Sequence, residues 1–538
     1  MSRVILEMER KPYFRAFRKK FPKNRQLWFY GVAALVSFTV FVVFWCTNIF
    51  RDSILSSLEL RNGSMALTWW QRPPIPLVYK IYIFNYTNIP EFESGSASKL
   101  RVEELGPYIY REQDDEVVVV PNIPLMGALA FSRDMSFVAQ LTMTIGLTTL
   151  QVKPFVNLPA GGYLWGYDDK IFLMAKPFVT FKQPVEKFGV LAAKKGVNSD
   201  RITIHTGLGD HGNLGMIQLI NGVSDRKVWN DKECDMVYGT DGSVFPPELL
   251  RDRNTTVYVY AKDLCRKVPF RYQSRAMSNG IPVYRYKLPE DVFTSSETKD
   301  ACFCAKTLGN ENEDARVCPP AGIFNTTLCN NGFPLLVSLP HFYTGEPSLF
   351  QHIDGLTPEA ERHESYFDMH PRLSIPISGW SRFQMNVEVR KGSSMPLSGR
   401  VKDGTILPLI WLEVGIEDIP ESVYKMLYAA HFLASAFEAC CQWFSLIALV
   451  FLLFGFITTL RKQQPIEHTC IPSYWDRAST ITESISVFFP REYSEYLANV
   501  FVLFVLLRAY KYYFDPSGIK STAETSLSLE FCCIIQEF

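Results

Sequence analysis

Residues 26–50 read QLWFYGVAALVSFTVFVVFWCTNIF and contain no charged side chain. At roughly 1.5 Å per residue, a helix of this length crosses a hydrocarbon core of about 30 Å with some tilt. The alternative is a cleaved signal peptide, but no small-residue cleavage pattern precedes Arg51-Asp52. The stretch therefore predicts a signal anchor that fixes the chain to a membrane.

A second uncharged run covers residues 439–460 and ends at Arg461-Lys462. Nine basic residues precede the first run, and six of them follow residue 14: Arg15, Arg18, Lys19, Lys20, Lys23 and Arg25. Because cytoplasmic flanks carry an excess of Lys and Arg, we expect both termini to face the cytoplasm. The resulting organisation is a cytoplasmic tail (1–25), a transmembrane helix (26–50), an extracellular or lumenal domain (51–438), a second transmembrane helix (439–460) and a cytoplasmic tail (461–538).

Charge and composition exclude several classes of protein. The 538 residues include 55 basic and 55 acidic side chains, whereas a nucleic-acid-binding protein normally has a basic excess. The hydrophobic fraction of 47% is ordinary for a globular protein, so most of the mass must lie outside the bilayer. The same fraction excludes disordered and collagen-like chains.

Six of the twelve cysteines lie in the outer segment: Cys234, Cys265, Cys302, Cys304, Cys318 and Cys329. An oxidising compartment makes disulfides the default, and six cysteines allow 15 pairings among which spacing does not choose. The Cys-x-Cys at 302 and 304 resembles part of a zinc site, but the usual C-x₂₋₄-C spacing is missing. We therefore predict no metal site and no cofactor.

Four N-x-S/T sequons also lie in the outer segment, and they are candidate glycosylation sites: Asn62, Asn85, Asn254 and Asn325. The outer segment makes up most of the chain, so the common location of the four sequons adds little evidence for the predicted topology. The topology depends on the two apolar runs and their flanking charges.

Strand patterns dominate the outer segment. In residues 382–390, Phe383, Met385, Val387 and Val389 alternate with polar residues, which predicts a strand with one buried and one solvated face. Further strands are predicted at 78–86, 117–120, 257–260, 283–287 and 406–411. With Pro and Gly between them and no internal repeat, this pattern favours a large, mostly antiparallel β domain with a few helices.

One segment differs from this pattern. Between Leu125 and Leu158 the only charged residues are Arg133, Asp134 and Lys153. The apolar residues Phe137, Leu141, Ile145 and Leu147 follow each other at a rough three-to-four spacing, which indicates a helix. If this helix is buried, it belongs to the core; if it is exposed, it forms an apolar patch large enough to mark a ligand or membrane contact.

Catalytic motifs are missing or weak. Residues 207–212 read G-x-G-x-x-G, but the following Asn213-Leu214-Gly215 is loop-like, so a turn is favoured over a dinucleotide site. Neither the H-E-x-x-H nor the G-x-S-x-G signature occurs, and no glycosidase pair can be recognised. His341 is interpreted as a core histidine with satisfied hydrogen bonds, and we expect no enzymatic activity.

A series of segments, in order along the chain, resembles the class B scavenger receptor family. They are IYIFNYTN within 70–88, ELGPYIYRE around Gly106-Pro107-Tyr108, VVVPNIPLMGA from Val118, LWGYDD from Leu164, CDMVYGTDGSVFPP from Cys234, IPVYRYKLP from Ile281, CFC from Cys302, LPHF from Leu339, IDGL from Ile353 and LPLIWLE from Leu407. The resemblance covers about residues 27–460.

The resemblance implies a fold and a set of disulfides. The implied fold is mainly β with α: an antiparallel β-barrel pierced by an apolar tunnel, with a helical apex at residues 133–158. The implied pairs are Cys234–Cys302, Cys265–Cys329 and Cys304–Cys318. The chain departs from the family in keeping only Lys153 of the lysines usual in the apex, and in its short interval from Tyr110 to Val117, which puts the barrel in question.

The resemblance also implies a function. We expect a plasma-membrane receptor that binds fatty acids, phospholipids, sterols or lipoproteins and passes apolar cargo through the tunnel to the membrane. Lys153 would attract an anionic head group, and Phe137, Leu141 and Phe155 would hold the tail. One alternative is a trafficking receptor of endosomes or lysosomes for a soluble lumenal protein, suggested by a dileucine-like Ile534-Ile535. A two-span ligand-gated channel is another, although residues 439–460 show no polar stripe.

Overall fold

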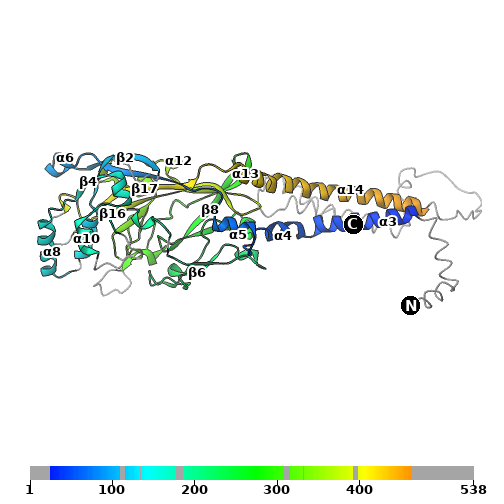
Figure 1. Ribbon diagram of the computed structural model, residues 1–538, viewed down its shortest axis with the longest axis horizontal. Helices are drawn as coiled ribbons and strands as arrows, with labels where there is room; N and C mark the ends of the chain where they lie inside the picture. Colours follow the sequence, from blue (N-terminus) through cyan, green and yellow to red (C-terminus); the bar gives the residue numbers. More distant parts are fainter. Residues whose placement is uncertain are drawn as a thin grey trace, which may run out of the picture. The chain divides into compact units, whose positions relative to one another are not determined.

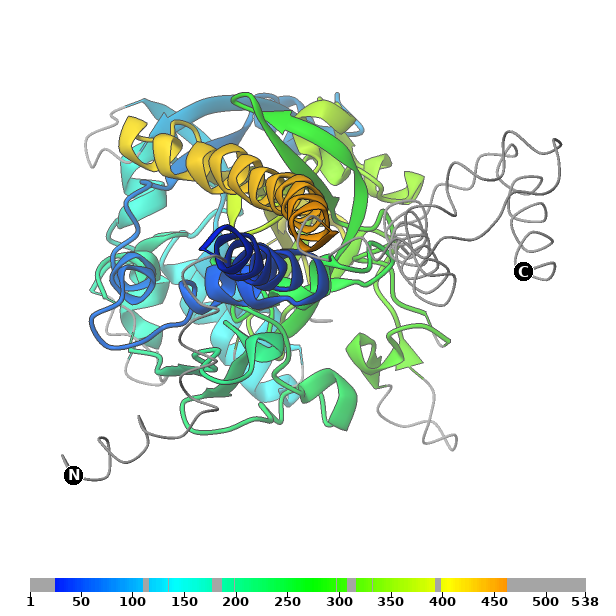
Figure 2. The ribbon, with the colours of Figure 1, turned by 90° about the vertical axis from the view of Figure 1, so that its right-hand side faces the viewer.

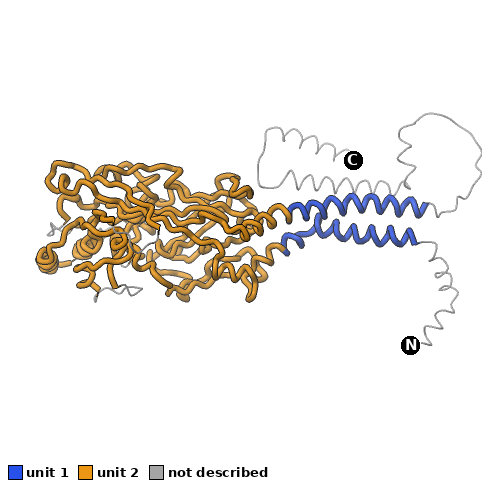
Figure 3. Tube along the Cα trace, turned by 45° about the horizontal axis from the view of Figure 1, so that its top comes forward, with its two compact units in different colours: residues 1–53, 434–538 blue, residues 54–433 orange. Residues whose placement is uncertain are grey.

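The computed structural model describes residues 25–461 except 110–115, 134, 177–185, 198, 297, 307–315, 331 and 392–397. The chain divides into two compact units, which Figure 3 shows in different colours. Among the described residues, unit 1 comprises 25–53 and 434–461, and unit 2 comprises 54–433. The predicted sorting signal and the cysteines after residue 461 lie outside the described residues.

Two helical runs are long and apolar enough to cross a membrane, Arg25–Cys46 and Glu421–Arg461. The first consists of α3 (Arg25–Phe41) and a π-helical turn (Val42–Cys46), and it ends where Thr47 adopts an extended conformation. Helix α4 (Ile49–Ser56) then begins, so residues 26–50 do not form one continuous helix. The second run contains α14 (Ala434–Arg461), which includes the whole of the predicted span 439–460.

Within unit 1, α3 and α14 lie side by side in both views (Figures 1 and 2). The Ser37 hydroxyl donates to the carbonyl of Ser445 (2.8 Å), and the Trp45 indole donates to that of Gln442 (2.9 Å). The Gln442 amide donates back to the carbonyl of Phe44 (2.9 Å). Polar side chains inside an apolar helix pair commonly form such bonds. Gln442 and Ser445 are therefore used in helix–helix packing.

An eleven-stranded sheet forms the centre of unit 2. Its main path runs β14-β2-β1-β17-β16-β15-β9-β8-β7, with β13 pairing with β16 and β12 with β13. All pairs are antiparallel except β14 with β2, as predicted for most of the domain. The strands are β1 (Val78–Tyr86), β2 (Leu100–Ile109), β7 (Val257–Ala261), β8 (Arg266–Ser278), β9 (Ile281–Lys287), β12 (Ile323–Asn325), β13 (Leu335–Ser338), β14 (Ile353–Asp354), β15 (Tyr366–Met369), β16 (Pro376–Glu388) and β17 (Ile406–Ile416).

No closed barrel is found among the described strands, which differs from the expected β-barrel. A barrel closes only when its two outermost strands pair with each other, and here β14 and β7 stand at opposite ends of the strand order. Strand β14 is only two residues long and pairs with β2 alone. The fold class is therefore a mixed α/β domain built on a large open sheet.

Three two-stranded sheets and several helices complete unit 2. The strand pairs are β3 (Val117–Pro121) with β4 (Phe155–Pro159), β5 (Ile202–Ile204) with β6 (Ile217–Ile220), and β10 (Ala305–Lys306) with β11 (Arg316–Val317). The α-helices are α5 (Met65–Gln71), α6 (Ile89–Ser94), α7 (Ile123–Ser132), α8 (Phe137–Thr149), α9 (Ala160–Trp165), α10 (Lys170–Ala175), α11 (Lys232–Asp235), α12 (Ala360–His363) and α13 (Glu421–Tyr428). The predicted strands and the helix containing Phe137 are confirmed. The G-x-G-x-x-G segment forms a turn, also as predicted.

The predicted burial pattern of β16 is only partly correct. Val387 and Val389 are buried as predicted, but Phe383 and Met385 are half-buried, and the polar residues Arg382, Gln384 and Asn386 are buried as well, with at most 8% exposure. The Gln384 amide nitrogen donates to Asn386 (2.7 Å), and the Asn386 amide nitrogen donates to the Ser338 hydroxyl (3.0 Å). Burying an amide costs little only when it is hydrogen-bonded. Alternation located the strand, but these partners determined which face is buried.

The Gly106-Pro107 motif marks a tight approach between two strands. Gly106 has φ of +128°, a conformation that side chains with a Cβ rarely adopt. A Cβ at this position would lie 2.7 Å from the carbonyl oxygen of Ile81. The β1–β2 register shifts at the same place, between Ile81 and Ile83. Glycine therefore allows β2 to stay paired with β1, which places Glu104 in the sheet.

Candidate functional site

Helix α8 lies at one end of unit 2, opposite the end that carries α5 and α13 (Figure 1). The Asn122 side chain caps α7 by accepting from the Leu125 amide (3.1 Å). Helix α7 is almost entirely apolar and mostly buried, whereas only Gln140 and Leu147 of α8 are buried. Helix α8 thus covers a buried helix and leaves most of its own surface in contact with solvent.

The exposed surface of α8 is apolar and has no charged residue. Phe137 and Val138 are 66% and 71% exposed, and Leu141 and Ile145 are 45% and 60% exposed. Its threonines bond to carbonyl groups of the helix itself, as Thr142 does to Val138 (2.9 Å). Contiguous apolar surface of this kind on a folded protein marks a contact with another molecule. We refer to Phe137, Val138, Leu141 and Ile145 as the apolar apex.

The four predicted ligand-binding residues do not share one surface. Phe137 and Leu141 lie in the apolar apex, and Lys153 is exposed after α8. The Lys153 carbonyl accepts from the Asn122 amide (3.1 Å), which leaves its side chain out of that bond. Phe155 is buried in the core, with its ring centroid 5.1 Å from that of Tyr86. Phe155 therefore contributes to packing in this structure.

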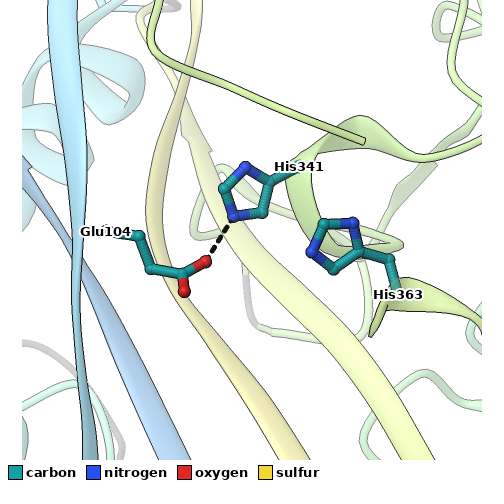
Figure 4. A group of neighbouring side chains, drawn as sticks. All are labelled: Glu104, His341 and His363. Carbon is teal, nitrogen blue, oxygen red and sulfur yellow. Dashed lines mark hydrogen bonds and ion pairs between the residues drawn. The ribbon is translucent and has the colours of Figure 1, made fainter. Parts of the chain in front are cut away.

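A second candidate site is a polar cluster around the half-buried Glu104 on β2. His341 Nε2 lies 2.5 Å from Glu104 Oε2, and the Trp411 indole donates to the same oxygen (2.9 Å). Arg362 Nη2 donates to Oε1 (2.8 Å). His363 stacks on His341, with ring centroids 4.6 Å apart and planes at 11°. Figure 4 shows the carboxylate and the two rings together, and we refer to these five residues as the Glu104 cluster.

Electrostatics fixes the protonation states of Glu104 and His363 at neutral pH. Burial raises the pKa of the Glu104 carboxyl, but hydrogen bonds from His341, Trp411 and Arg362 outweigh burial and lower the pKa to about 2. Burial, together with the neighbouring His341 and Arg362, lowers the pKa of His363 to about 3. Glu104 is therefore ionised and His363 is neutral at neutral pH.

Both histidines of the cluster have the same tautomer, because backbone amides donate to their Nδ1 atoms. Thr357 N donates to His341 Nδ1 (3.1 Å), and Glu359 N donates to His363 Nδ1 (2.9 Å). A neutral imidazole has one N–H, so in His363, and in His341 when it is neutral, that hydrogen is on Nε2. The His341 Nε2–H consequently donates to Glu104.

This tautomer does not suit a metal ion. One nitrogen of each ring and one oxygen of Glu104 lie within 4.8 Å of one another, and two histidines with one carboxylate form a common zinc ligand set. A neutral histidine that binds a metal through Nε2 has its hydrogen on Nδ1 and donates it to an acceptor. Here a backbone N–H already points at each Nδ1, so metal binding would place two hydrogens against each other. The donor set fits an internal hydrogen-bond network better than a metal.

The structure joins the same three cysteine pairs that the family resemblance implies: Cys234–Cys302, Cys265–Cys329 and Cys304–Cys318. Asp231 lies near the first pair and forms a second group of metal-ligand residue types. Its two sulfurs are bonded to each other, so they offer no thiolate to a metal ion. The cysteines in unit 2 therefore act as cross-links.

The four sequons differ in their surroundings. Asn62 and Asn254 are exposed in turns. Asn85 and Asn325 are half-buried in strands, where the Asn85 side chain accepts from Val119 N (2.8 Å) and that of Asn325 accepts from Thr327 N (2.9 Å). A glycan on Asn85 or Asn325 would have to leave from a strand of the large sheet.

Sequence reasoning missed most of the Glu104 cluster. His341 was correctly interpreted as a buried, hydrogen-bonded histidine, but Glu104, Arg362 and His363 carry no motif of their own. One signal was available: Gln384 and Asn386 occupy every second position of a strand, and Gln384 accepts from His341 N (2.7 Å). Polar residues at period two next to an apolar face can indicate a second buried face.

Comparison with known proteins gives a consistent result. A model of the CD36 family matches residues 29–117 and 112–460. Scavenger receptor class B member 1 of Rattus norvegicus is 25% identical over 407 residues, which is 70% of this chain and 77% of the relative. Lysosome membrane protein 2 of Homo sapiens is 28% identical over 434 residues, which is 74% of this chain and 87% of the relative.

Proposed function

The chain belongs to the CD36 family, and on that premise we propose that it is a receptor that binds lipids or lipoproteins and passes apolar cargo to the membrane. The observation that carries the proposal is the apolar apex. Each buried CH₂ group contributes about 0.8 kcal/mol, so an uncharged helix surface with a phenylalanine, a leucine, an isoleucine and a valine can bind an acyl surface without any ion pair.

The cargo would travel through the interior of unit 2 and leave at the membrane. The strands of the large sheet run lengthwise between the end that carries α8 and the end that carries α5 and α13 (Figure 1). A continuous apolar path along them would keep hydrocarbon out of water during the whole transfer. Membrane residence, with both termini in the cytoplasm and the ligand-binding domain outside, is part of the same proposal.

Binding to lipid emulsions tests the role of the apolar apex. The full chain in nanodiscs is mixed with a neutral phospholipid emulsion, and bound protein is separated by flotation. Leu141→Gln should weaken binding roughly tenfold, because burying a leucine is worth about 1.5–3 kcal/mol. Leu208→Gln is the matched control, since Leu208 is also exposed (63%) but lies in the turn formed by residues 207–209. Equal binding by both variants and the unmodified chain would reject the proposal.

A transfer assay tests the passage of cargo separately. A fluorescent acyl lipid is supplied in the emulsion, and its arrival in the nanodisc membrane is followed by quenching. Leu141→Gln should slow arrival by the same factor by which it weakens binding. If arrival is as slow with the unmodified chain as with empty nanodiscs, the protein binds lipid without passing it on.

A second candidate function is a trafficking receptor for a soluble lumenal protein. The similarity to lysosome membrane protein 2 favours it, because that relative's name places it in the lysosome membrane. The exposed apolar apex would then contact a protein. Deleting residues 530–538, which contain Ile534-Ile535, should move the protein to the cell surface if this signal sorts it. An unchanged distribution in live-cell imaging would speak against sorting by this segment.

A further inference from the structure

Strand β8 has an open edge along its second half. Residues 266–270 of β8 pair with β7 on one side, whereas residues 271–278 pair only with β9 on the other side. Among the described strands, none lies against the opposite side of 271–278. A row of unpaired backbone N–H and C=O groups is a template on which a strand of another chain can form.

The backbone groups that face outward belong to Arg275 and Met277. Residues 279 and 280 both have positive φ and form a two-residue turn, which makes Ser278 and Ile281 a hydrogen-bonded pair. Hydrogen-bonded and non-hydrogen-bonded pairs alternate along an antiparallel ladder. Arg275 and Met277 therefore occupy non-hydrogen-bonded positions opposite β9, and their N–H and C=O groups point away from it.

This edge is regular and accessible. The β8–β9 register shifts between Tyr272 and Ser274, which is before the two outward-facing residues, and it is continuous from Ser274 to Ser278. Met277 is 63% exposed, and Arg275 is exposed as well. Within the described part of the chain, neither backbone forms a hydrogen bond outside the β8–β9 ladder. Residues 274–278 thus offer a short, straight stretch of strand to a partner.

Charge selects the kind of strand that fits this edge. Strand β8 contains four basic residues and no acidic one. Arg266 is buried, and Lys267 Nζ lies 3.5 Å from a carboxylate oxygen of Glu233. The exposed charges beside the open edge are therefore Arg271 and Arg275. Because like charges directly opposite each other destabilise a strand pair and opposite charges stabilise it, the edge disfavours a second copy of β8 and favours an acidic strand.

We propose that residues 274–278 of β8 bind an extended acidic segment of a partner protein, which adds a strand to the large sheet. Backbone hydrogen bonds to Arg275 and Met277 supply the affinity, and carboxylates next to Arg271 and Arg275 supply the selectivity. The turn that follows β8 adjoins α13, since a Cβ built on Gly280 would lie 3.9 Å from the Tyr424 hydroxyl. Helix α13 is at the end of unit 2 opposite α8 (Figure 1), so this site is separate from the apolar apex.

Matched peptides test the proposal on the full chain in detergent. A short fluorescein-labelled peptide in which glutamate and valine alternate should bind, as followed by fluorescence anisotropy. The same peptide with lysine in place of glutamate should bind about tenfold more weakly, because Arg271 and Arg275 repel it. A glutamate–valine peptide with every backbone amide N-methylated keeps its charges but has no N–H to donate, and it should also lose about tenfold. Equal binding of the methylated peptide would show attraction by charge alone, and that result, or no binding of any peptide, would overturn the proposal.

Three variants locate the binding at the edge. Met277→Pro removes one outward-facing N–H that the β8–β9 ladder does not use, and it should weaken binding of the glutamate peptide about fivefold, the effect of one hydrogen bond. Met277→Ala keeps this N–H and should bind within about twofold of the unmodified chain. Arg275→Gln should remove most of the preference for glutamate over lysine. Binding that is unchanged in Met277→Pro would place the peptide elsewhere and reject the proposal.

A second copy of the chain is the competing occupant of the edge. Analytical ultracentrifugation of the unmodified chain and of Met277→Pro, both without peptide, distinguishes the two occupants. We expect the same oligomeric state for both proteins. A dimer of the unmodified chain that dissociates in Met277→Pro would identify a second copy as the occupant and overturn the proposal of an acidic partner.

Discussion

His341 and Glu104 lie 237 positions apart in the sequence, and their Nε2 and Oε2 atoms are 2.5 Å apart in the fold. The contact joins a 3₁₀ turn, Pro340–Phe342, to strand β2. His341 acts as the donor in this contact, because its Nδ1 already accepts from Thr357 N and its Nε2 therefore carries the hydrogen. The pair therefore connects distant parts of unit 2 through one half-buried carboxylate.

Replacing Glu104 by glutamine should destabilise the protein strongly. The variant removes a half-buried negative charge that accepts from His341, Trp411 and Arg362, and hydrogen bonds to charged groups contribute about 1.5–3 kcal/mol. We expect a loss of at least about 2 kcal/mol in denaturant unfolding of the full chain in detergent. Glu103→Gln, the exposed neighbour on β2, is the control and should change the free energy of unfolding by less than about 0.5 kcal/mol.

Replacing Arg382 by methionine should also destabilise the protein. Arg382 and Glu413 face each other on β16 and β17, and Arg382 Nε and Nη2 donate to Glu413 Oε1 at 2.8 and 2.6 Å. Removing one partner of a buried pair leaves the other charge uncompensated and costs about 3–5 kcal/mol. Lys425→Met breaks an exposed pair with Glu421 (2.8 Å) and should cost less than about 0.5 kcal/mol. Similar losses of unfolding free energy in the two variants would contradict the expectation that the buried pair contributes more than the exposed one.

Stability should decrease as the pH falls below neutrality. Burial lowers the pKa of His363 to about 3, and burial together with His431 lowers that of His370 to about 4, both from 6.5. Between these values and 6.5 the unfolded chain binds a proton that the folded chain does not. The contribution of these two histidines to the free energy of unfolding is therefore fully present above pH 6.5. It is lost as the pH falls toward 4, at up to about 1.4 kcal/mol per pH unit for each histidine.

Unfolding midpoints measured at several pH values between 7.5 and 4.5 check this expectation. The double variant His363→Asn, His370→Asn should show a flatter dependence, because asparagine keeps an acceptor for the backbone amides and does not titrate. His205→Asn changes an exposed histidine and should leave the dependence as it is. A double variant as sensitive to acid as the unmodified chain would assign the effect to other groups.

Lys153 should contribute to the binding of anionic lipids. A lysine near an anionic surface contributes about 1 kcal/mol, so Lys153→Gln should weaken binding to phosphatidylserine vesicles about fivefold and leave neutral vesicles unaffected. Surface expression should stay normal, since the side chain is exposed and Asn122 holds only the backbone carbonyl. Lys232→Gln changes another exposed lysine and serves as the control. Unchanged affinity for both vesicles would remove Lys153 from the mechanism.

Local patterns in the sequence were sufficient to locate individual helices and strands along the chain. Alternation located β16, the apolar spacing after Phe137 located α8, and two uncharged runs located α3 and α14. Each of these signals arises within one element, because the repeat of a helix or strand decides which side chains share a face. The family resemblance added the disulfide pairs, which spacing alone left among 15 alternatives.

The sequence by itself thus determined the two apolar helices, most strands and an uncharged α8, whose exposure only the structure decided. Only the tertiary structure decided that Arg382, Gln384 and Asn386 are buried, that Phe155 belongs to the core and that Glu104 meets two histidines. The physical reason is the same in each case. A polar side chain is buried when its hydrogen-bond partners come to it, and those partners lie on other strands and turns whose positions no local pattern encodes.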